Sequence, residues 1–342
     1  MSPKRRATLS DVAGRAGVSA VTVSRAIRHP EMVSEKLRLK ISDAVRRLNY
    51  IPNHLARALA STRTHIVGVI VPSLTNGVFD DYLSAIQDVF VPAGIMVLVL
   101  NVRYSADEEE KAIGTLLSYH PEALIVAGID QTQRSLQLLK RSGIPIVQTM
   151  ELTDKPVDLN IGLSHEKAGH AAVHYLFERG YRRIAYLAAH LDPRARRRKT
   201  GYQRAMDELG LPNEGLVALS PNPPGVPIGG KLFLEVLARA PDVDALFCGN
   251  DDLALGALFE CQRQGIRVPE GLAIVGFNNL DFSESCVPPL TSVGTERSKM
   301  GTWAATCILE IIRGSGKRPK QNQVDLGFSI IERGSSGPRR SS

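Results

Sequence analysis

Residues 8–28 read TLSDVAGRAGVSAVTVSRAIR and predict two short helices joined by a tight turn at Gly17. Thr8 is placed to cap the first helix, with Asp11 three residues later as in a capping box. Gly17 can adopt the positive φ that ends a helix, and Ser19 is placed to cap the second helix. A second helix with small polar and basic side chains is typical of a DNA-binding helix-turn-helix, although an ordinary pair of packed helices gives a similar local pattern.

The positive charge of the chain is concentrated around this stretch. The 342 residues carry a formal net charge of +7. Residues 1–64 contain 13 Lys and Arg against 4 Asp and Glu, a net charge of +9, so the rest of the chain has a net charge of −2. Apolar residues at helical spacing between Leu37 and Leu48 predict a third helix that completes a small core. A folded basic segment of this kind favours a polyanionic partner such as DNA.

Composition excludes several other classes of protein. The sequence has no apolar run of 18 residues and no apolar segment behind its basic start, so we expect no membrane span and no secretory leader. The four cysteines lie far apart and match no metal-binding spacing, which favours free thiols in a reducing compartment. We therefore expect a cytoplasmic protein without a cofactor.

From residue 66 onward, apolar stretches alternate with amphipathic ones. IVGVIVP at 66–72 is followed by FDDYLSAIQDVFVPAG at 79–94, and a second series of the same kind begins after a polar link at 152–159. Continuous apolar strands that alternate with helices predict parallel sheets covered on both faces. The sequence thus predicts a small all-α helix-turn-helix headpiece and an α/β core of two lobes, with a late helix and strand that return across the gap.

Three stretches together resemble the start of the lactose-repressor/galactose-repressor (LacI/GalR) family of transcription factors. They are residues 8–28, VSEKLRLKISDAVRRLNYIPNHLARALA at 33–60 and HIVGVIVPSL at 65–74, and the resemblance extends over the whole chain. It implies a headpiece, a hinge helix and a periplasmic-binding-protein-like core with three crossovers, and it implies a homodimer. The implied domains are 1–51 (headpiece), 52–64 (hinge helix and linker) and 65–335 (effector binding and dimerisation), with an N-lobe of about 65–160 plus 295–324 and a C-lobe of about 161–291 plus 325–335.

The resemblance also implies how the protein contacts DNA. Ala20, Val21 and Arg25 would face base edges in the major groove, and Leu59 would be an apolar wedge that enters the minor groove of a pseudo-palindromic operator. A valine can contact a thymine methyl group but makes no bidentate hydrogen bond, so Arg25 and the hinge are expected to carry much of the specificity. The predicted DNA-binding residues are Thr8, Ser19, Ala20, Val21, Thr22, Ser24, Arg25, Asn53, His54, Arg57 and Leu59.

Candidate ligand-binding side chains follow the predicted strands, where open parallel sheets bind their ligands. Amide and hydroxyl groups suit a polyhydroxylated ligand, and arginines suit an anionic one. The segments 71–79, 185–192 with 198–206, and 247–265 resemble gluconate-type repressors, which implies a sugar acid such as gluconate, 2-ketogluconate or a phosphorylated relative. The predicted effector-binding residues are Ser73, Thr75, Asn76, Phe79, Arg194, Arg198, Asn250 and Asn278.

Three motifs suggest other chemistry and do not complete it. His165, His170 and His174 lie near Glu166, but H-E-x-x-H is not met, so we predict no metal site. Residues 225–231 spell G-x-x-x-x-G-K, but the next residue is a leucine rather than the Ser or Thr that would hold Mg²⁺. The sequence contains no G-x-S-x-G elbow.

The predicted function is that of a ligand-controlled DNA-binding repressor and not an enzyme. A solute-binding protein for a sugar or sugar acid is the main alternative, because the two lobes fit it, and an α/β enzyme is the third. The sequence leaves open whether the ligand releases the repressor from its operator or tightens the complex.

Overall fold

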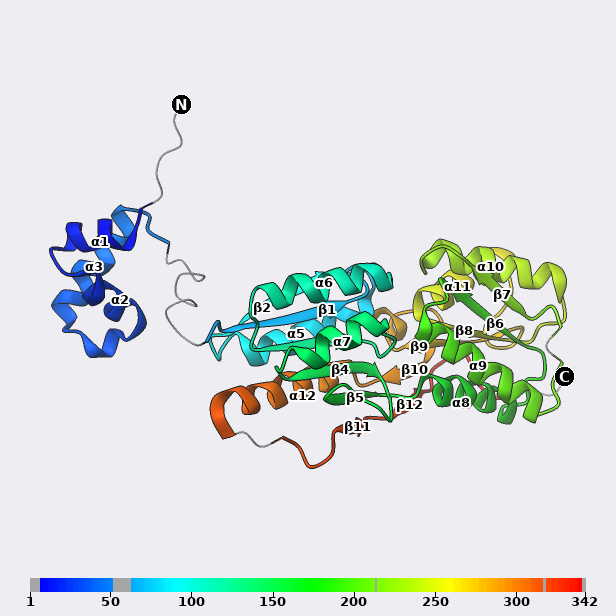
Figure 1. The fold of residues 1–342 in the computed structure, drawn as a ribbon. Coiled ribbons are helices and arrows are strands. Elements are labelled where there is room, and N and C mark those ends of the chain that lie inside the picture. The colour runs from blue at the N-terminus through cyan, green and yellow to red at the C-terminus, as the bar shows by residue number, and fades with distance from the viewer. Residues whose placement is uncertain (1–6, 52–62, 213, 316–317, 340–342) are drawn as a thin grey trace. The chain divides into compact units, whose positions relative to one another are not determined.

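The structure is a computed structural model that describes residues 7–51, 63–212, 214–315 and 318–339. The chain divides into two compact units, Met1–Thr64 and His65–Ser342, which are described separately (Figure 1). Within the described residues, no helix has both the length and the apolar character that crossing a bilayer requires.

The first unit contains the three predicted helices, α1 (Leu9–Ala16), α2 (Ala20–Arg28) and α3 (Glu35–Arg47), with a short 3₁₀ turn η1 (Pro30–Met32) after α2. They enclose a small apolar core built from Val12, Ala13, Ala16, Val23, Ala26, Ile41 and Ala44.

The expected caps hold the ends of α1 and α2. Thr8 donates its backbone N–H to Asp11 Oδ2 (2.8 Å), and Thr8 Oγ1 accepts from the Asp11 backbone N–H (3.3 Å), which forms the predicted capping box. Gly17 has φ 62°, and Ser19 Oγ accepts from the backbone N–H of Thr22 (3.1 Å). Ser34 precedes α3, but its side chain makes no capping hydrogen bond.

The second unit contains two six-stranded sheets. In spatial order, the strands of the first sheet are β11 (Gln323–Asp325), β5 (Leu159–Leu163), β4 (Ile146–Glu151), β3 (Ala123–Ala127), β1 (Ile66–Val71) and β2 (Met96–Asn101), all parallel. Those of the second sheet are β12 (Phe328–Ile331), β10 (Thr291–Thr295), β9 (Ala273–Asn278), β8 (Ala245–Cys248), β6 (Ile184–Ala189) and β7 (Val217–Ser220), and β12 alone among them is antiparallel to its neighbour.

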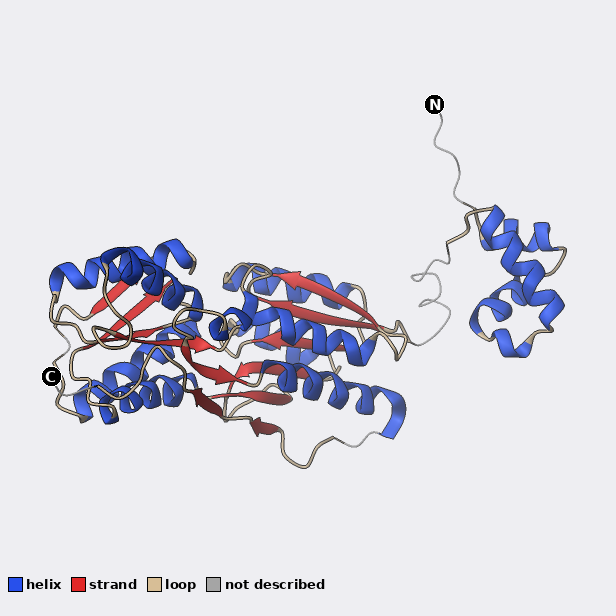
Figure 2. Ribbon diagram, turned by 180° about the vertical axis from the view of Figure 1, so that it is seen from behind, coloured by secondary structure: helices blue, strands red, loops and turns tan. Residues whose placement is uncertain are grey.

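Each sheet is sandwiched between two pairs of helices, as predicted (Figure 2). The first sheet packs against α5 (Asp80–Phe90) with α12 (Arg297–Glu310), and against α6 (Ala106–Ser118) with α7 (Gln133–Arg141). Val69 of β1 faces the α5 side and Ile70 faces the α6 side, because successive side chains of a strand alternate between its faces. The second sheet is covered by α8 (His165–Glu178) with α9 (Pro193–Glu208), and by α10 (Val226–Arg239) with α11 (Asp251–Gln264). The shorter helical turns are η2 (Gly77–Phe79), η3 (Asp281–Glu284) and the π-type η4 (Ile311–Ser315).

The chain passes between the lobes three times, after β5, after β10 and between β11 and β12. The lobe limits that the sequence suggested, about 160 and 291, fall within or at the start of strands. In the structure β5 belongs to the first sheet as far as Leu163, and β10 belongs to the second as far as Thr295. The limits drawn from the strands therefore lie a few residues later.

Candidate functional site

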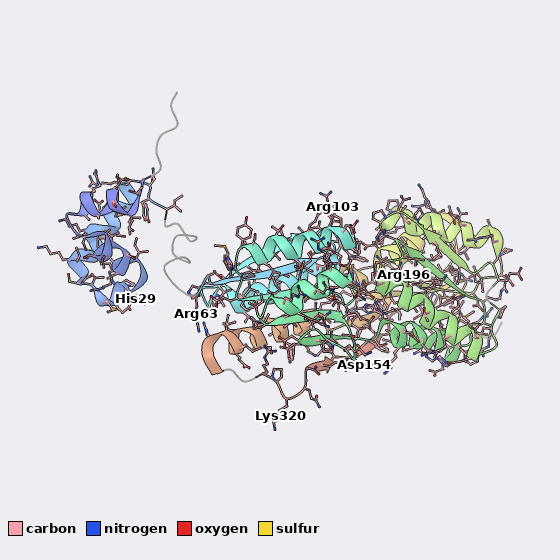
Figure 3. The ribbon with its side chains drawn as sticks, viewed as in Figure 1. His29, Arg63, Arg103, Asp154, Arg196 and Lys320 are labelled. Carbon is pink, nitrogen blue, oxygen red and sulfur yellow. The ribbon has the colours of Figure 1, made fainter. Side chains whose placement is uncertain are left out.

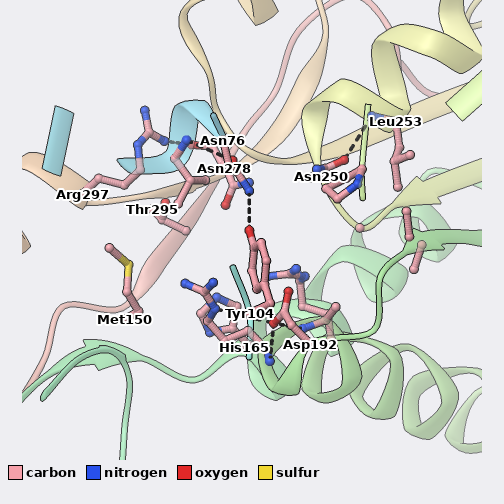
Figure 4. A pocket seen from close by; sticks show the side chains of 18 of the residues that line it. Asn76, Tyr104, Met150, His165, Asp192, Asn250, Leu253, Asn278, Thr295 and Arg297 are labelled. Carbon is pink, nitrogen blue, oxygen red and sulfur yellow. Dashed lines mark hydrogen bonds and ion pairs between the residues drawn. The ribbon is translucent and has the colours of Figure 1, made fainter. Parts of the chain in front are cut away.

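A cleft of about 640 Å³, counting the space open to solvent, lies between the two lobes at the carboxyl ends of the strands (Figure 4). Both lobes and the crossover after β10 contribute side chains to it. Its lining residues are Asn76, Val78, Tyr104, Met150, Leu163, His165, Ala188, Ala189, Asp192, Arg194, Ala195, Arg198, Pro224, Gly249, Asn250, Leu253, Asn278, Thr295, Arg297 and Met300.

Five of the predicted effector-binding residues line this cleft, namely Asn76, Arg194, Arg198, Asn250 and Asn278. The other three support it from outside the lining. Ser73 Oγ accepts from the backbone N–H groups of Thr75 and Asn76, both at 3.1 Å, and so shapes the turn that presents the Asn76 amide. Thr75 itself is exposed, and Phe79 is fully buried with the Arg194 guanidinium 5.5 Å from its ring centroid.

The arginines at 194 and 196–198, which follow β6, lie in the first half of α9. Asp192 is the N-cap of α9, its Oδ1 accepts from the backbone N–H of Arg194 (2.8 Å), and Pro193 occupies the first turn. The helical turn separates the arginines: Arg194 and Arg198 point into the cleft, whereas Arg196 is exposed and donates to the Leu191 carbonyl (Figure 3).

Arg198 is buried with an incomplete set of hydrogen bonds. Its side chain is 9% exposed, and its guanidinium lies 4.6 Å from the centroid of the Phe277 ring. Its Nε has no hydrogen-bond partner among the described residues, and the same holds for Nε of Arg297, another cleft residue. A buried donor without a partner costs about 1–3 kcal/mol, and an acceptor that reached either Nε would relieve that cost.

The titratable groups around Arg198 leave the cleft electropositive. Burial, and then the charges of Arg198 and Arg194, lower the pKa of His165 well below its ordinary value, so this imidazole is neutral at pH 7. Burial raises the pKa of Asp192, but the nearby Arg194 and Arg198 outweigh it and the pKa is lowered overall, so Asp192 is ionised. Among the lining residues one carboxylate, Asp192, thus accompanies three arginines, Arg194, Arg198 and Arg297, and Arg297 has a further carboxylate partner, Asp81, outside the lining.

The structure adds cleft residues that the sequence reasoning missed. Tyr104 follows β2 and its hydroxyl accepts from Asn76 Nδ2 (3.1 Å), as Figure 4 shows. Arg297 follows β10 and donates to Asp81 Oδ2 (2.7 Å) and to the Asn278 carbonyl. Both stand just beyond the carboxyl end of a strand, so the rule that identified Asn250 would have identified them also.

Direct contacts between the lobes border the cleft. Arg197 on α9 forms a bidentate ion pair with Asp130, which follows β3, at 2.8 and 2.7 Å, and its Nε lies 3.7 Å from Glu151 Oε2. The ring of Tyr104 lies 5.0 Å from that of His190 in the other lobe. These contacts join the two lobes beside the cleft.

In the headpiece, α2 presents the predicted face. Val21 is 68% exposed and Arg25 is also exposed, while Ala20, Thr22 and Ser24 are partly exposed. Thr8 and Ser19 are exposed at the N-cap positions of α1 and α2. The basic side chains of the other two helices are exposed as well: Arg15, Lys36, Arg38, Lys40, Arg46 and Arg47. The predicted hinge contacts Asn53, His54, Arg57 and Leu59 lie outside the described residues.

Comparisons with known proteins agree with both units. Residues 8–53 match the family of bacterial regulatory proteins of the lacI type, and residues 64–330 match the periplasmic binding proteins and sugar-binding domain of the LacI family. The HTH-type transcriptional regulator GntR of Pseudomonas aeruginosa is 44% identical over 97% of this chain and 96% of its own.

Solved structures show the same architecture. A LacI-family transcriptional regulator from Silicibacter pomeroyi has a TM-score of 0.90 and 32% identity, covering 98% of this chain and all of that one. The lac repressor dimer bound to operator and the anti-inducer ONPF has a TM-score of 0.81 and 26% identity, covering 97% of this chain and all of that one.

The headpiece, the two-lobed core and these matches define a bacterial transcriptional regulator. The chain belongs to the LacI family. It is a DNA-binding transcriptional repressor and not an enzyme, as predicted, and the family match does not favour the alternative of a solute-binding protein.

Proposed function

We propose that the effector of this repressor is a sugar acid of the gluconate type, bound in the cleft between the lobes. The observation that carries the proposal is the buried Arg198, whose unpartnered Nε belongs to a cleft that is lined by two further arginines and one carboxylate. A carboxylate or phosphate group offers a guanidinium charged acceptors, which form stronger hydrogen bonds than the uncharged hydroxyl oxygens of a neutral sugar. The resemblance to gluconate-type repressors supports the same ligand class.

The remaining lining suits the rest of such a ligand. The amides of Asn76, Asn250 and Asn278 offer donors and acceptors, and the Tyr104 hydroxyl lies beside them. Asn250 Oδ1 already accepts from the Leu253 backbone N–H (3.0 Å), so its Nδ2 is the group that remains for a hydroxyl. Gluconate, 2-ketogluconate and their phosphorylated relatives combine an anionic end with a chain of hydroxyls.

The first experiment replaces the buried arginine. The variant Arg198→Ala is expected to lose the response to the sugar acid and to bind operator as the unaltered protein does, because Arg198 lies in the second unit and the DNA-binding helices in the first. A thermal-shift screen of gluconate, 2-ketogluconate, their phosphorylated forms and neutral glucose identifies the ligand, and calorimetry measures its affinity.

The matched control is Arg196→Ala, which removes an exposed arginine from the same helix and should leave the response intact. If calorimetry shows the same sugar-acid affinity in Arg198→Ala as in the unaltered protein, Arg198 is not in the binding site. A thermal shift with neutral glucose alone would contradict a sugar-acid effector.

We also propose that α2 lies in the major groove of the operator, with Arg25 as its main hydrogen-bonding residue. Val21 and Ala20 on the same exposed face can contact only apolar groups such as a thymine methyl. Arg25→Ala should therefore weaken operator binding by about 1–3 kcal/mol, or about 5- to 150-fold. It should also reduce the ratio of the affinity for operator to the affinity for non-specific DNA. Electrophoretic mobility shifts at a fixed salt concentration measure both affinities. The control is Arg103→Ala, which removes an exposed arginine from the second unit. If the ratio of specific to non-specific affinity does not change in Arg25→Ala, Arg25 does not contact base edges.

A homodimer in the cytoplasm completes the proposal. The edge strand β2 is partly exposed along its whole length, with Met96 at 42%, and carries five apolar residues in six. An open apolar edge favours pairing with a second copy. Two headpieces would then read a pseudo-palindromic operator, and a ligand that changes lobe closure would change the separation of the two hinge segments.

A further inference from the structure

Two histidines of α8 and the last residue of α9 meet where these helices pack together in the C-lobe. His170 Nε2 lies 2.6 Å from Glu208 Oε2, and His174 Nε2 lies 3.8 Å from the same oxygen. The three ligand atoms all lie within 4.8 Å of one another, and the two imidazole rings are 4.3 Å apart between centroids. None of these residues lines the cleft between the lobes.

Sequence alone grouped these histidines with a different acid. The H-E-x-x-H pattern that the sequence does not meet involves Glu166, which lies on the same helix as His170. In the structure Glu166 pairs instead with Arg204 (2.5 Å), and the carboxylate beside the histidines is that of Glu208, 38 residues from His170. Packing of α8 against α9 brings it there.

The frame that holds the cluster is rigid because the two helices touch through glycines. A Cβ on Gly169 would collide with the Arg198 backbone, and one on Gly201 would collide with the Glu166 carbonyl. Gly169 is adjacent to His170 in sequence, so this close approach fixes the height of His170 against α9. His174 follows one helical turn later on the same face.

Neighbouring charges orient the carboxylate. Arg204 Nε lies 3.4 Å from Glu208 Oε1, which leaves Oε2 turned toward the imidazoles. His174 Nε2 is buried and has no hydrogen-bond partner in the part of the chain that the structure describes. His170 Nε2 and Glu208 Oε2 share a hydrogen bond at 2.6 Å, and a metal ion that took the place of its proton would gain the unpartnered Nε2 of His174 as a third ligand.

We propose that His170, His174 and Glu208 form a binding site for a transition metal ion, with Zn²⁺ as the best fit. Two imidazole nitrogens and one carboxylate oxygen suit Zn²⁺, Ni²⁺ and Cu²⁺, whereas Mg²⁺ and Ca²⁺ favour oxygen ligands throughout. Three protein ligands leave the fourth position of a tetrahedral zinc ion to water. The ion fastens the end of α9 to α8, the helix pair whose other ends carry Arg198 and His165 into the cleft.

Calorimetry with Zn²⁺ on the full chain, prepared without a polyhistidine tag and treated with a chelator, tests the proposal. The unaltered protein should bind one Zn²⁺ per chain and unfold at a higher temperature when Zn²⁺ is present. Glu208→Gln and His174→Gln should each weaken Zn²⁺ binding by at least about tenfold, because each removes one of three ligands. Affinity should also fall as the solution is acidified, because the metal and protons compete for the imidazoles.

Two control variants separate the site from general surface binding. Glu166→Gln removes a carboxylate that also contacts Arg204, and His120→Gln removes an exposed histidine of the other lobe. Both should bind Zn²⁺ as the unaltered protein does. The four variants should unfold at similar temperatures without metal, since each alters an exposed or partly exposed side chain.

The absorption spectrum of the Co²⁺-loaded protein identifies the ligand atoms. Nitrogen and oxygen ligands give d–d bands without a sulfur-to-metal charge-transfer band, and a charge-transfer band would assign the metal to a cysteine and overturn the proposal. It is also overturned if Zn²⁺ does not bind, or if Glu208→Gln and Glu166→Gln bind it equally well. None of these measurements uses DNA or the sugar acid. They therefore test the metal site independently of the proposed effector.

Discussion

Asp251, the first residue of α11, is a fully buried carboxylate that joins three segments of the C-lobe. Its Oδ1 accepts from Ser292 Oγ (2.6 Å), and its Oδ2 accepts from the Leu280 backbone N–H (2.7 Å) and from Ser283 Oγ (3.2 Å). Burial raises the pKa of Asp251 to about 6, although these hydrogen bonds oppose the rise. The group thus holds its proton more firmly in the folded chain than in the unfolded one.

This raised pKa predicts the sign of a pH effect on stability. Between about pH 4 and pH 6 the folded state binds the Asp251 proton and the unfolded state has lost it, so the free energy of unfolding falls as the pH rises. About two pKa units correspond to a loss of about 3 kcal/mol from this group. Urea unfolding across this range should show a steeper fall in the unaltered protein than in Asp251→Asn, and equal slopes in the two proteins would contradict the assignment.

Some residues of the cleft could be predicted from the sequence, and others could not. Arg198, Asn250 and Asn278 could be predicted because they lie at or after the ends of apolar strands, and strand ends of an open parallel sheet meet at one edge. Phe79 follows β1 too, but its ring is apolar and η2 turns it into the core. Which way a side chain turns depends on packing that the local sequence does not contain.

At the scale of elements, α8 and α9 pack closely enough to exclude side chains at their contact. Gly201→Ala would push its new methyl group into the Glu166 carbonyl, and no flexible side chain is there to give way. We expect a loss of about 1–3 kcal/mol or more in unfolding free energy, as for other overpacked contacts.

Gly114 on α6 is the matched control, since nothing lies within 4 Å of the position where its Cβ would be. Gly114→Ala should leave stability unchanged or raise it by up to about 1 kcal/mol, because alanine favours the helix. Chemical unfolding of both variants measures the difference. If Gly201→Ala and Gly114→Ala have the same unfolding free energy, α8 can shift relative to α9 without loss of stability.

The elements themselves were largely predictable, and the errors lie at helix starts. The pattern of apolar residues predicts one helix over 198–210 and another over 230–240, whereas α9 begins at Pro193 and α10 at Val226. In each case a proline stands in the first turn, where its missing N–H costs nothing. Asp192 stands just before Pro193, and an aspartate followed by a proline is a signal for the start of a helix. This signal places the arginines at 194 and 196–198 on α9.

At the scale of the whole molecule, the ion pair of Arg197 with Asp130 holds the lobes in the arrangement that forms the cleft. A ligand that contacts both lobes binds this arrangement. Asp130→Asn should therefore weaken effector binding by about 0.5–1 kcal/mol, or about two- to fivefold, although Asp130 is not one of the residues lining the cleft around Arg198.

Calorimetry with the identified effector measures this change, and small-angle scattering reports whether the lobes open. Exchanging the charges in Asp130→Arg with Arg197→Asp should restore part of the affinity and not all of it, because the new carboxylate at position 197 would face Glu151. By contrast, Asp107→Asn on the exposed face of α6 should have no effect. An affinity that is the same in all of these variants would show that this ion pair does not govern closure.

The two-lobed plan was predictable because its apolar strands are long and continuous, but the contacts between lobes were not. Arg197 was one of several arginines in a run, and its partner Asp130 lies 67 residues away. Arg197 differs from the exposed Arg196 only because it contacts the other lobe, and the sequence does not show how the two lobes pack against each other.

The three passages between the lobes also determine the order in which the protein can be completed during synthesis. The outermost strands β11 and β12 come from residues 323–331, so each sheet lacks an edge until nearly the whole chain has left the ribosome. The three headpiece helices, by contrast, lie within residues 9–47 and emerge first. Because domains fold as units from the N-terminus during translation, a growing chain has a finished DNA-binding unit long before it has the unit that answers to a ligand.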